Sequence, residues 1–175
     1  MIKIETLSPK HSKGIEKNIK DKEVVKWTLN IPHPYPQNGA IDFIKKAHRA
    51  KKARKEFHFA IIHDGNTIGG IGFTKIDWKS KHAELGYWLG KKYWGKGYMT
   101  KAVKEMLEFG FTNLKLHRIC AEVYEPNKAS QRVLNKNGFK LEGKLKEAAY
   151  RNKRFYDQLI FGKLNNKEYK SRQNR

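Results

Sequence analysis

The chain has 175 residues, with 38 lysine and arginine side chains against 17 aspartate and glutamate side chains, a formal net charge of +21. This length fits one domain with a hydrophobic core of its own, and no apolar run approaches the roughly 18 residues that a membrane-spanning helix needs. The single cysteine, Cys120, excludes a disulfide within the chain. A polar start, without the apolar segment of a signal peptide, predicts a cytoplasmic protein.

The first third of the chain predicts one strand and two helical stretches. Residues 2–7 alternate between apolar and polar side chains, as a half-buried strand does, and residues 11–30 are weakly helical. Residues 31–36 contain three prolines, each of which favours extended geometry in the residue before it, so a rigid loop is expected. Asn38 can cap the next helix, which is expected to run to about Lys55.

The later elements follow from alternation, helical spacing and turn residues. Strands are expected at residues 57–62, 67–76, 83–89, 118–124, 139–150 and 155–164, and helices at residues 98–113 and 128–136. This order predicts an α/β fold with a sheet of mixed direction and helices on its faces. Residues 1–164 are expected to form a single domain, and residues 165–175 a polar, flexible tail.

The excess positive charge predicts an anionic partner, such as nucleic acid, the ribosome or a phosphorylated cofactor. The charge is densest between Lys45 and Lys55. That stretch contains no aromatic side chains, which single-stranded nucleic acid would favour. An ordinary solvated helix face is therefore the alternative interpretation.

Residues 84–100 are the most informative segment, because a strand is followed by a basic loop with glycines and then by a helix. Glycine lets the backbone bend and lets a ligand approach its amides. A helix start offers unpaired N–H groups and the positive end of the helix dipole. Together these features predict a phosphate-binding loop, for a nucleotide, a dinucleotide or coenzyme A.

Two common phosphate-binding motifs fit this loop poorly. Gly90, Gly95 and Lys96 have the spacing of a P-loop, but Gly97 stands where a serine or threonine would hold magnesium. The sequence from Gly95 to Thr100 begins like a dinucleotide-binding fingerprint, but it lacks the third glycine and does not lie in a first βαβ unit.

The loop resembles instead the pyrophosphate loop of the GNAT acetyltransferases, Gln/Arg-x-x-Gly-x-Gly/Ala, with Lys92 in the first position and residues 92–97 reading Lys-Tyr-Trp-Gly-Lys-Gly. Residues 127–139 resemble a second segment of that family, Asn-x-x-Ser/Ala followed by Gly-Phe. Together with residues 83–89 and 116–119, they are most similar to the RimJ/RimL-like branch, which acetylates the N-terminal amines of ribosomal proteins. The resemblance implies a mostly antiparallel, twisted sheet flanked by helices on both faces.

The resemblance also implies acetyl-CoA as cosubstrate. In the family, backbone amides of the strand at residues 84–89 bind the pantetheine and face the thioester carbonyl, an oxyanion-hole role, and the glycine loop holds the pyrophosphate. Lys91 and Lys128 could add charge beside Lys92 and Lys96. The implied cofactor-binding residues are Tyr87, Trp88, Leu89, Lys92, Tyr93, Trp94, Gly95, Lys96, Gly97, Tyr98, Met99, Asn127 and Ser130.

The catalytic residues that the resemblance implies are Glu84 and Ser130. Glu84 is the candidate general base, acting through water, although it could equally be a structural carboxylate paired with a lysine. Leu134 occupies the position where many family members carry an acidic tyrosine. Ser130, one turn earlier, is the candidate hydrogen-bond donor to the leaving thiolate, or else a small residue required by packing. Asn127 is expected to cap the helix and to contact the cofactor.

The predicted function is acetyl transfer to a primary amine, most simply a ribosomal-protein N-terminal α-amine, by direct attack in a ternary complex. Acetylation of a small-molecule amine, such as an amino acid or an antibiotic, is an alternative, and so is a non-catalytic CoA- or RNA-binding module. The charge of +21 disfavours a polyamine. The scattered histidines predict no metal site, and the chain is expected to be a monomer or a homodimer. Cys120 is expected to be a buried structural thiol.

Overall fold

The computed structural model describes residues 1–28, 31–151 and 153–165 of the chain. Within them the strands follow the hydrogen-bonded order β1-β2-β3-β4-β5-β7-β6. β4 and β5 run parallel, whereas the pairs β1–β2, β2–β3, β5–β7 and β6–β7 run antiparallel. The expected mixed, mostly antiparallel α/β sheet is therefore confirmed. The strands are β1 (Ile2–Thr6), β2 (Phe57–His63), β3 (Asn66–Asp77), β4 (His82–Leu89), β5 (Arg118–Tyr124), β6 (Lys140–Arg151) and β7 (Arg154–Leu164).

The packing divides the chain into two compact units. The first consists of Met1–Thr74 and Gly86–Ala102, and the second of Lys75–Leu85 and Val103–Arg175. Two strands and one helix therefore contribute residues to both units. The helices are η1 (Pro9–His11), α1 (Ser12–Ile19), α2 (Lys22–Val25), α3 (Gly39–Lys52), η2 (Lys91–Tyr93), α4 (Tyr98–Glu108), η3 (Phe109–Asn113) and α5 (Lys128–Lys136).

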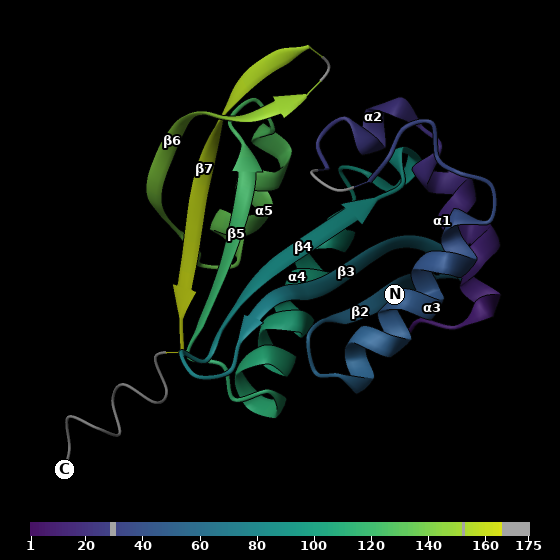
Figure 1. Cartoon of the computed structure of the whole chain (residues 1–175), viewed down its shortest axis with the longest axis horizontal. Coiled ribbons are helices and arrows are strands. Elements are labelled where there is room, and N and C mark those ends of the chain that lie inside the picture. The colour runs from purple at the N-terminus through teal and green to yellow at the C-terminus, as the bar shows by residue number, and fades with distance from the viewer. Residues whose placement is uncertain (29–30, 152, 166–175) are drawn as a thin grey trace. The chain divides into compact units, whose positions relative to one another are not determined.

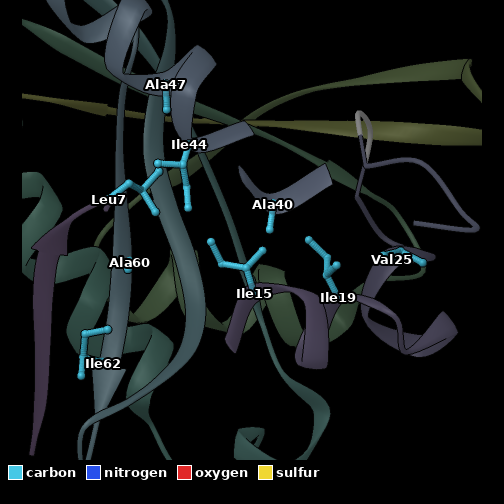
Figure 2. Packing of buried hydrophobic residues seen from close by; sticks show 9 residues of the cluster. All are labelled: Leu7, Ile15, Ile19, Val25, Ala40, Ile44, Ala47, Ala60 and Ile62. Carbon is cyan, nitrogen blue, oxygen red and sulfur yellow. The ribbon is translucent and has the colours of Figure 1, made fainter. Parts of the chain in front are cut away.

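The core of the first unit forms where α1 and α3 pack together and α3 covers β2 (Figure 1). Each helix places its apolar residues on one face, because residues four apart lie one above the other on a helix. Burying this much aliphatic surface is the main source of stability for the unit. Figure 2 shows the cluster, which consists of Leu7, Ile15, Ile19, Val25, Ala40, Ile44, Ala47, Ala60 and Ile62.

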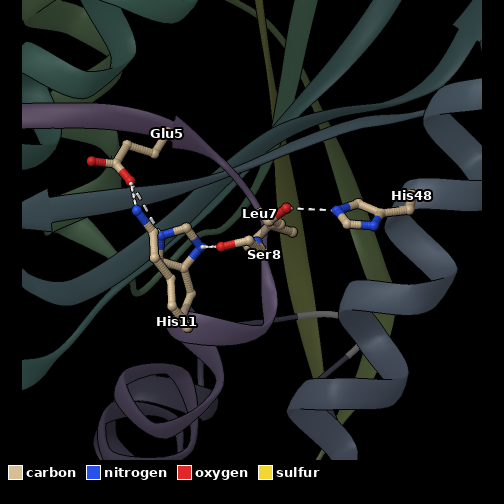
Figure 3. A network of polar contacts seen from close by, with 6 residues as sticks. Glu5, Leu7, Ser8, His11 and His48 are labelled. Atoms are coloured by element: carbon tan, nitrogen blue, oxygen red, sulfur yellow. Dashed lines mark hydrogen bonds and ion pairs between the residues drawn. The ribbon is translucent and has the colours of Figure 1, made fainter.

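A buried histidine joins the first strand to the first helix of the same unit (Figure 3). His11 is 2% exposed. Its Nδ1 accepts a hydrogen bond from the Ser8 backbone N–H at 3.0 Å, so the proton of the neutral ring is on Nε2, which lies 3.4 Å from Glu5 Oε2. His48 of α3 donates to the Leu7 carbonyl oxygen, which ties α3 to the same segment.

In the second unit, β5 pairs with β7, and β7 pairs in turn with β6 to form a long hairpin (Figure 1). β5 buries Ile119, Ala121 and Val123, whereas the alternate positions Arg118 and Glu122 stay partly exposed. The register places Cys120 of β5 opposite Glu84 of β4. Because side chains alternate along a strand, β5 has one apolar side and another side that carries Arg118 and Glu122.

Three local predictions were wrong in detail. The stretch expected to be helical at residues 11–30 contains two helices within residues 11–28, because Asp21 adopts extended geometry and its side chain accepts from the Glu23 N–H at 2.9 Å, which starts α2. Asn38 precedes α3 with a φ of 58° and makes no capping hydrogen bond through its side chain. The long helix ends at Glu108 and continues as one π-helical turn, Phe109–Asn113.

The remaining elements lie within a few residues of their expected bounds. Residues 29 and 30, residue 152 of the last turn and residues 166–175 of the expected tail lie outside the described residues. In the part of the chain that is described, no helix is both long enough and apolar enough to cross a bilayer.

Candidate functional site

The loop that follows β4 begins at a glycine that no other residue could replace without displacing its neighbour. The Gly90 N–H donates to the Ile68 carbonyl at 2.8 Å, and a Cβ at Gly90 would collide with the Asn18 side chain. Asn18 is itself buried, and its Nδ2 donates to the carbonyl oxygens of Gly14 and Thr67 at 2.9 and 3.0 Å. The start of the loop is therefore fixed by α1 and β3.

The middle of the loop is the predicted phosphate cradle. Gly95 and Gly97 have φ angles of 74° and 75°, a left-handed conformation that side chains disfavour, and open space surrounds the position of each missing Cβ. Trp94 Nε1 donates to the Leu89 carbonyl at 2.7 Å, which closes the loop back onto β4. The arrangement keeps the backbone around both glycines accessible to a ligand.

The loop leads directly into α4. The Lys101 N–H donates to the Gly97 carbonyl at 3.1 Å, so the first helical turn begins at the second glycine. The N–H groups of Tyr98 and Met99 are in the first turn and have no partner within the helix. They lie at the positive end of the helix dipole, beside the exposed side chain of Lys96. These groups form an anion-binding geometry of the kind that holds phosphate.

The end of β4 is held by close packing on β3. A Cβ at Gly69 would collide with the Trp88 carbonyl oxygen, and one at Gly70 would collide with the Trp88 indole. Trp88 also packs against the core cluster of the first unit. Tyr87 is half-buried and Leu89 is buried. The backbone from Tyr87 to Leu89, where the pantetheine was predicted to bind, is therefore rigidly placed.

Glu84, the candidate base, lies in the second unit and is ion-paired. Lys75 Nζ is 2.6 Å from Glu84 Oε2 and 3.5 Å from Glu122 Oε1. The hydrogen bond with Glu84 is the largest cause that raises the pKa of Lys75. The structure thus shows the lysine pairing that was the alternative interpretation of Glu84. Its role as a general base stays a prediction.

Cys120 lies near the charges of Glu84, Glu122 and Lys75, but its thiol is unreactive. The thiol is buried, as expected, and His82 Nε2 lies 3.0 Å from its Sγ. Burial, with a smaller contribution from the charge of Glu84, raises the pKa of Cys120 to about 11. The thiol is therefore protonated at neutral pH and is a poor nucleophile.

Asn127 and Ser130 come together at the start of α5. Asn127 Oδ1 accepts from the Ser130 N–H at 3.1 Å, which confirms the predicted helix cap. Ser130 is half-buried, and Leu134 one turn later is completely buried. Leu134 therefore belongs to the core of the second unit. Glu84, Asn127 and Ser130 belong to the second unit, whereas residues 87–89 and 92–99 belong to the first.

The interpretation of the sequence missed three further residues. Asn18 and Lys75 give no signal in the sequence, because the contacts that matter join distant segments. Glu122 could have been noticed from the alternation of polar residues at Arg118, Cys120 and Glu122 on a strand. Across residues 1–28, 31–151 and 153–165, no group of three or more histidine, cysteine, aspartate or glutamate side chains is placed to hold a metal ion.

Comparison with known proteins gives a consistent result. Residues 2–140 match the family described as acetyltransferase (GNAT) domain. The uncharacterized N-acetyltransferase p20 of Bacillus licheniformis is 35% identical over 146 residues, which is 82% of each chain. The ribosomal-protein-serine acetyltransferase of Escherichia coli is 31% identical over 61% of this chain and 59% of its own.

Several solved structures are similar over nearly the whole chain. One of them is the microcin C7 self-immunity acetyltransferase MccE in complex with acetyl-CoA and AMP, which is 25% identical. The superposition has a TM-score of 0.85 and covers 94% of this chain and 92% of that one.

Proposed function

Because this chain belongs to the GNAT acetyltransferase family, we propose that it acetylates the N-terminal α-amine of a protein or peptide, of the ribosomal-protein type. The chain is an N-acetyltransferase that uses acetyl-CoA, and the acceptor is the new part of the proposal. Its similarity to the ribosomal-protein-serine acetyltransferase of Escherichia coli supports an N-terminal acceptor. So do the sequence features of the RimJ/RimL-like branch.

The observation that carries the cofactor assignment is the loop at residues 90–97. Gly95 and Gly97 leave open space where side chains would otherwise stand, and the first-turn amides of α4 lie directly after them. A pyrophosphate fits this chemistry because its oxygens accept hydrogen bonds from N–H groups and carry the negative charge that a helix N-terminus favours. The proposed cofactor-binding residues are the set implied by the sequence: Tyr87, Trp88, Leu89, Lys92, Tyr93, Trp94, Gly95, Lys96, Gly97, Tyr98, Met99, Asn127 and Ser130.

The proposed chemistry is direct attack of the amine on the thioester in a ternary complex. Glu84 takes the proton of the attacking amine through a water molecule. Backbone N–H groups at the end of β4 hydrogen-bond the oxygen of the thioester carbonyl as it gains charge. The Ser130 hydroxyl donates a hydrogen bond to the departing thiolate sulfur.

The basic face of α3 supports the proposal that the acceptor amine lies near RNA. Lys45, Lys46, Arg49 and Lys52 are all exposed on α3, at spacings that place them along one side of the helix. Such a surface attracts phosphate backbones and repels a free polyamine. We propose ribosomal RNA in the cytoplasm as the neighbour of this face. RNA binding that weakens steeply as salt is added is the expected result, and no binding at low salt would contradict this neighbour.

Isothermal calorimetry with acetyl-CoA tests the cofactor site. Wild-type protein is expected to bind, and Gly97→Glu is expected to abolish binding because it places a carboxylate among the phosphate-binding amides. Gly65→Glu is the matched control, because Gly65 has a φ of 72° and open space around its missing Cβ but lies in the β2–β3 turn. Equal loss in both variants would attribute the effect to backbone strain rather than to the cradle.

An acceptor screen tests the substrate. Peptides with ribosomal-protein N-termini are compared with the same peptides blocked at the α-amine, with single amino acids and with spermidine, and release of CoA is followed. Turnover with unblocked peptides alone supports the proposal. Turnover only with a small amine contradicts it. RNA binding without any CoA release would instead favour a non-catalytic module.

A further inference from the structure

The first residue of α4 is anchored by a histidine from another part of the first unit. The Tyr98 hydroxyl lies 2.8 Å from His63 Nε2, and the two rings pack with their centroids 4.5 Å apart. His63 is the last residue of β2, and Tyr98 follows Gly97 directly. The contact therefore joins the sheet of the first unit to the point where the phosphate-binding loop becomes a helix.

The direction of this hydrogen bond follows from the other ring nitrogen. His63 Nδ1 lies 3.0 Å from the Met1 carbonyl oxygen, and a carbonyl oxygen can only accept, so Nδ1 carries the proton of the neutral ring. Nε2 then has a lone pair and accepts from the Tyr98 hydroxyl. Asp64 Oδ2, 3.3 Å from Nε2, cannot donate to it when ionised. In the neutral ring, Tyr98 is therefore the donor to this nitrogen.

We infer that His63 is a positioning residue for cofactor binding, which fixes the first turn of α4 through the Tyr98 side chain and so aims the loop amides at the pyrophosphate. This inference rests on the proposed acetyl-CoA site. Two glycines with left-handed φ give the loop many accessible conformations. An anchor at the residue after the second glycine reduces that freedom before the ligand arrives, and a preorganised site binds more tightly.

The contact can be removed while the ring packing is kept. Tyr98→Phe removes the donor, His63→Phe removes the acceptor, and the double variant removes both. Each single variant is expected to weaken acetyl-CoA binding in calorimetry roughly three- to tenfold, the range of one net hydrogen bond. The double variant is expected to bind like the single variants, because all three lose the same interaction. His63→Gln keeps an acceptor and is expected to recover part of the affinity.

A donor without phosphates separates positioning from a general structural role. The kcat/KM ratio of acetyl-CoA to acetyl-pantetheine measures what the nucleotide diphosphate contributes. His63→Phe is expected to lower this ratio and to leave kcat/KM for acetyl-pantetheine unchanged. His58→Phe is the matched control, because His58 also lies on β2, but its aromatic contact is Phe43 and its carboxylate partner is Glu56.

The outcomes distinguish this inference from the function on which it rests. Wild-type protein that fails to bind acetyl-CoA would overturn both. Wild-type binding with unchanged affinity in Tyr98→Phe and His63→Phe would overturn the inference alone. An equal loss of kcat/KM for acetyl-CoA and acetyl-pantetheine would also overturn it, because the effect would then not act on the phosphates.

Discussion

Lys75 Nζ lies 2.6 Å from Glu84 Oε2, so one carboxylate oxygen of the candidate base is held by an ammonium group. The same ammonium lies 3.5 Å from Glu122 Oε1 on the neighbouring strand. Its pKa is raised, mainly by the hydrogen bond with Glu84, so Lys75 stays charged at neutral pH. One cation is therefore shared by two carboxylates. The arrangement orients Glu84 through one of its two carboxylate oxygens.

Replacing Glu84 separates a catalytic role from a structural one. If Glu84 is the base, Glu84→Gln is expected to lower kcat at least a hundredfold, the lower end of what general-base catalysis contributes. Affinity for acetyl-CoA is expected to stay unchanged, because the side chain takes the amine proton rather than holding the cofactor. Stopped assays of CoA release and calorimetry measure the two quantities.

Glu122→Gln is the control for that change, because it removes the other carboxylate from the same ammonium. Its kcat is expected to stay within a few-fold of wild type. A similar loss of kcat in both variants would show that the ion-paired group, rather than Glu84 as a base, supports activity.

The hydroxyl of Ser130 is predicted to stabilise the leaving thiolate. Ser130→Ala is expected to lower kcat roughly tenfold or more, since a hydrogen bond to a charged group contributes about 1.5–3 kcal/mol. The helix cap should survive, because Asn127 accepts from the Ser130 backbone and not from its side chain. Unchanged kcat in Ser130→Ala would show that the position only requires a small residue. Ser12→Ala, at a half-buried serine of α1, is the control.

The Asn127 cap is predicted to stabilise α5. Asn127→Ala is expected to lower the free energy of unfolding by about 1 kcal/mol, because the Ser130 N–H loses its acceptor. Asn127→Asp keeps the acceptor oxygen and is expected to remain near wild type. Denaturant unfolding measures both. Equal stability of all three proteins would contradict the capping role, and Asn135→Ala on the exposed side of the same helix is the control.

Stability is predicted to fall on mild acidification because of His11 (Figure 3). Burial is the largest cause that lowers the pKa of His11, so between its folded pKa and the ordinary value of about 6.5 the unfolded chain binds more protons. The stabilisation is complete above that ordinary value and is lost as the pH falls toward the folded pKa. His11→Gln is expected to flatten the slope of unfolding free energy between about pH 7 and 5.

His33→Gln, at an exposed histidine, is the control for the substitution itself. Glu5 acts in a lower window: its pKa is lowered, chiefly by the hydrogen bond with Lys10, so its contribution is lost only as the pH falls below its ordinary value. A wild-type protein whose unfolding free energy is flat from pH 7 to 5 would contradict the account of His11.

Much of the fold could be predicted from the sequence because its signals are local. The alternation in residues 118–124 and the Asn127 cap gave the bounds of β5 and α5 as the structure has them. The boundary at Glu108 could not be predicted, because the apolar spacing continues through the π-helical turn. At Asn38 the residue type was right for a cap, but a left-handed backbone turns the side chain away from that role.

The candidate site also has features that the sequence predicts and features that it does not. The glycines at 95 and 97 are visible in the sequence because their chemistry lies in the backbone. His63 and Tyr98 are 35 positions apart along the chain. Asn18 donates to Thr67, 49 positions away, and lies against Gly90, which is farther still along the chain. No local pattern encodes such contacts. The left-handed φ of 47° at Lys75, which a lysine rarely adopts, is likewise set by tertiary structure.

The most direct test of the central claim is mass spectrometry of a peptide with a ribosomal-protein N-terminus after incubation with the wild-type protein and acetyl-CoA. One added acetyl group is expected on the α-amine, and none when Gly97→Glu replaces the wild type. An unmodified peptide, with acetyl-CoA bound and a small amine acetylated instead, would contradict it.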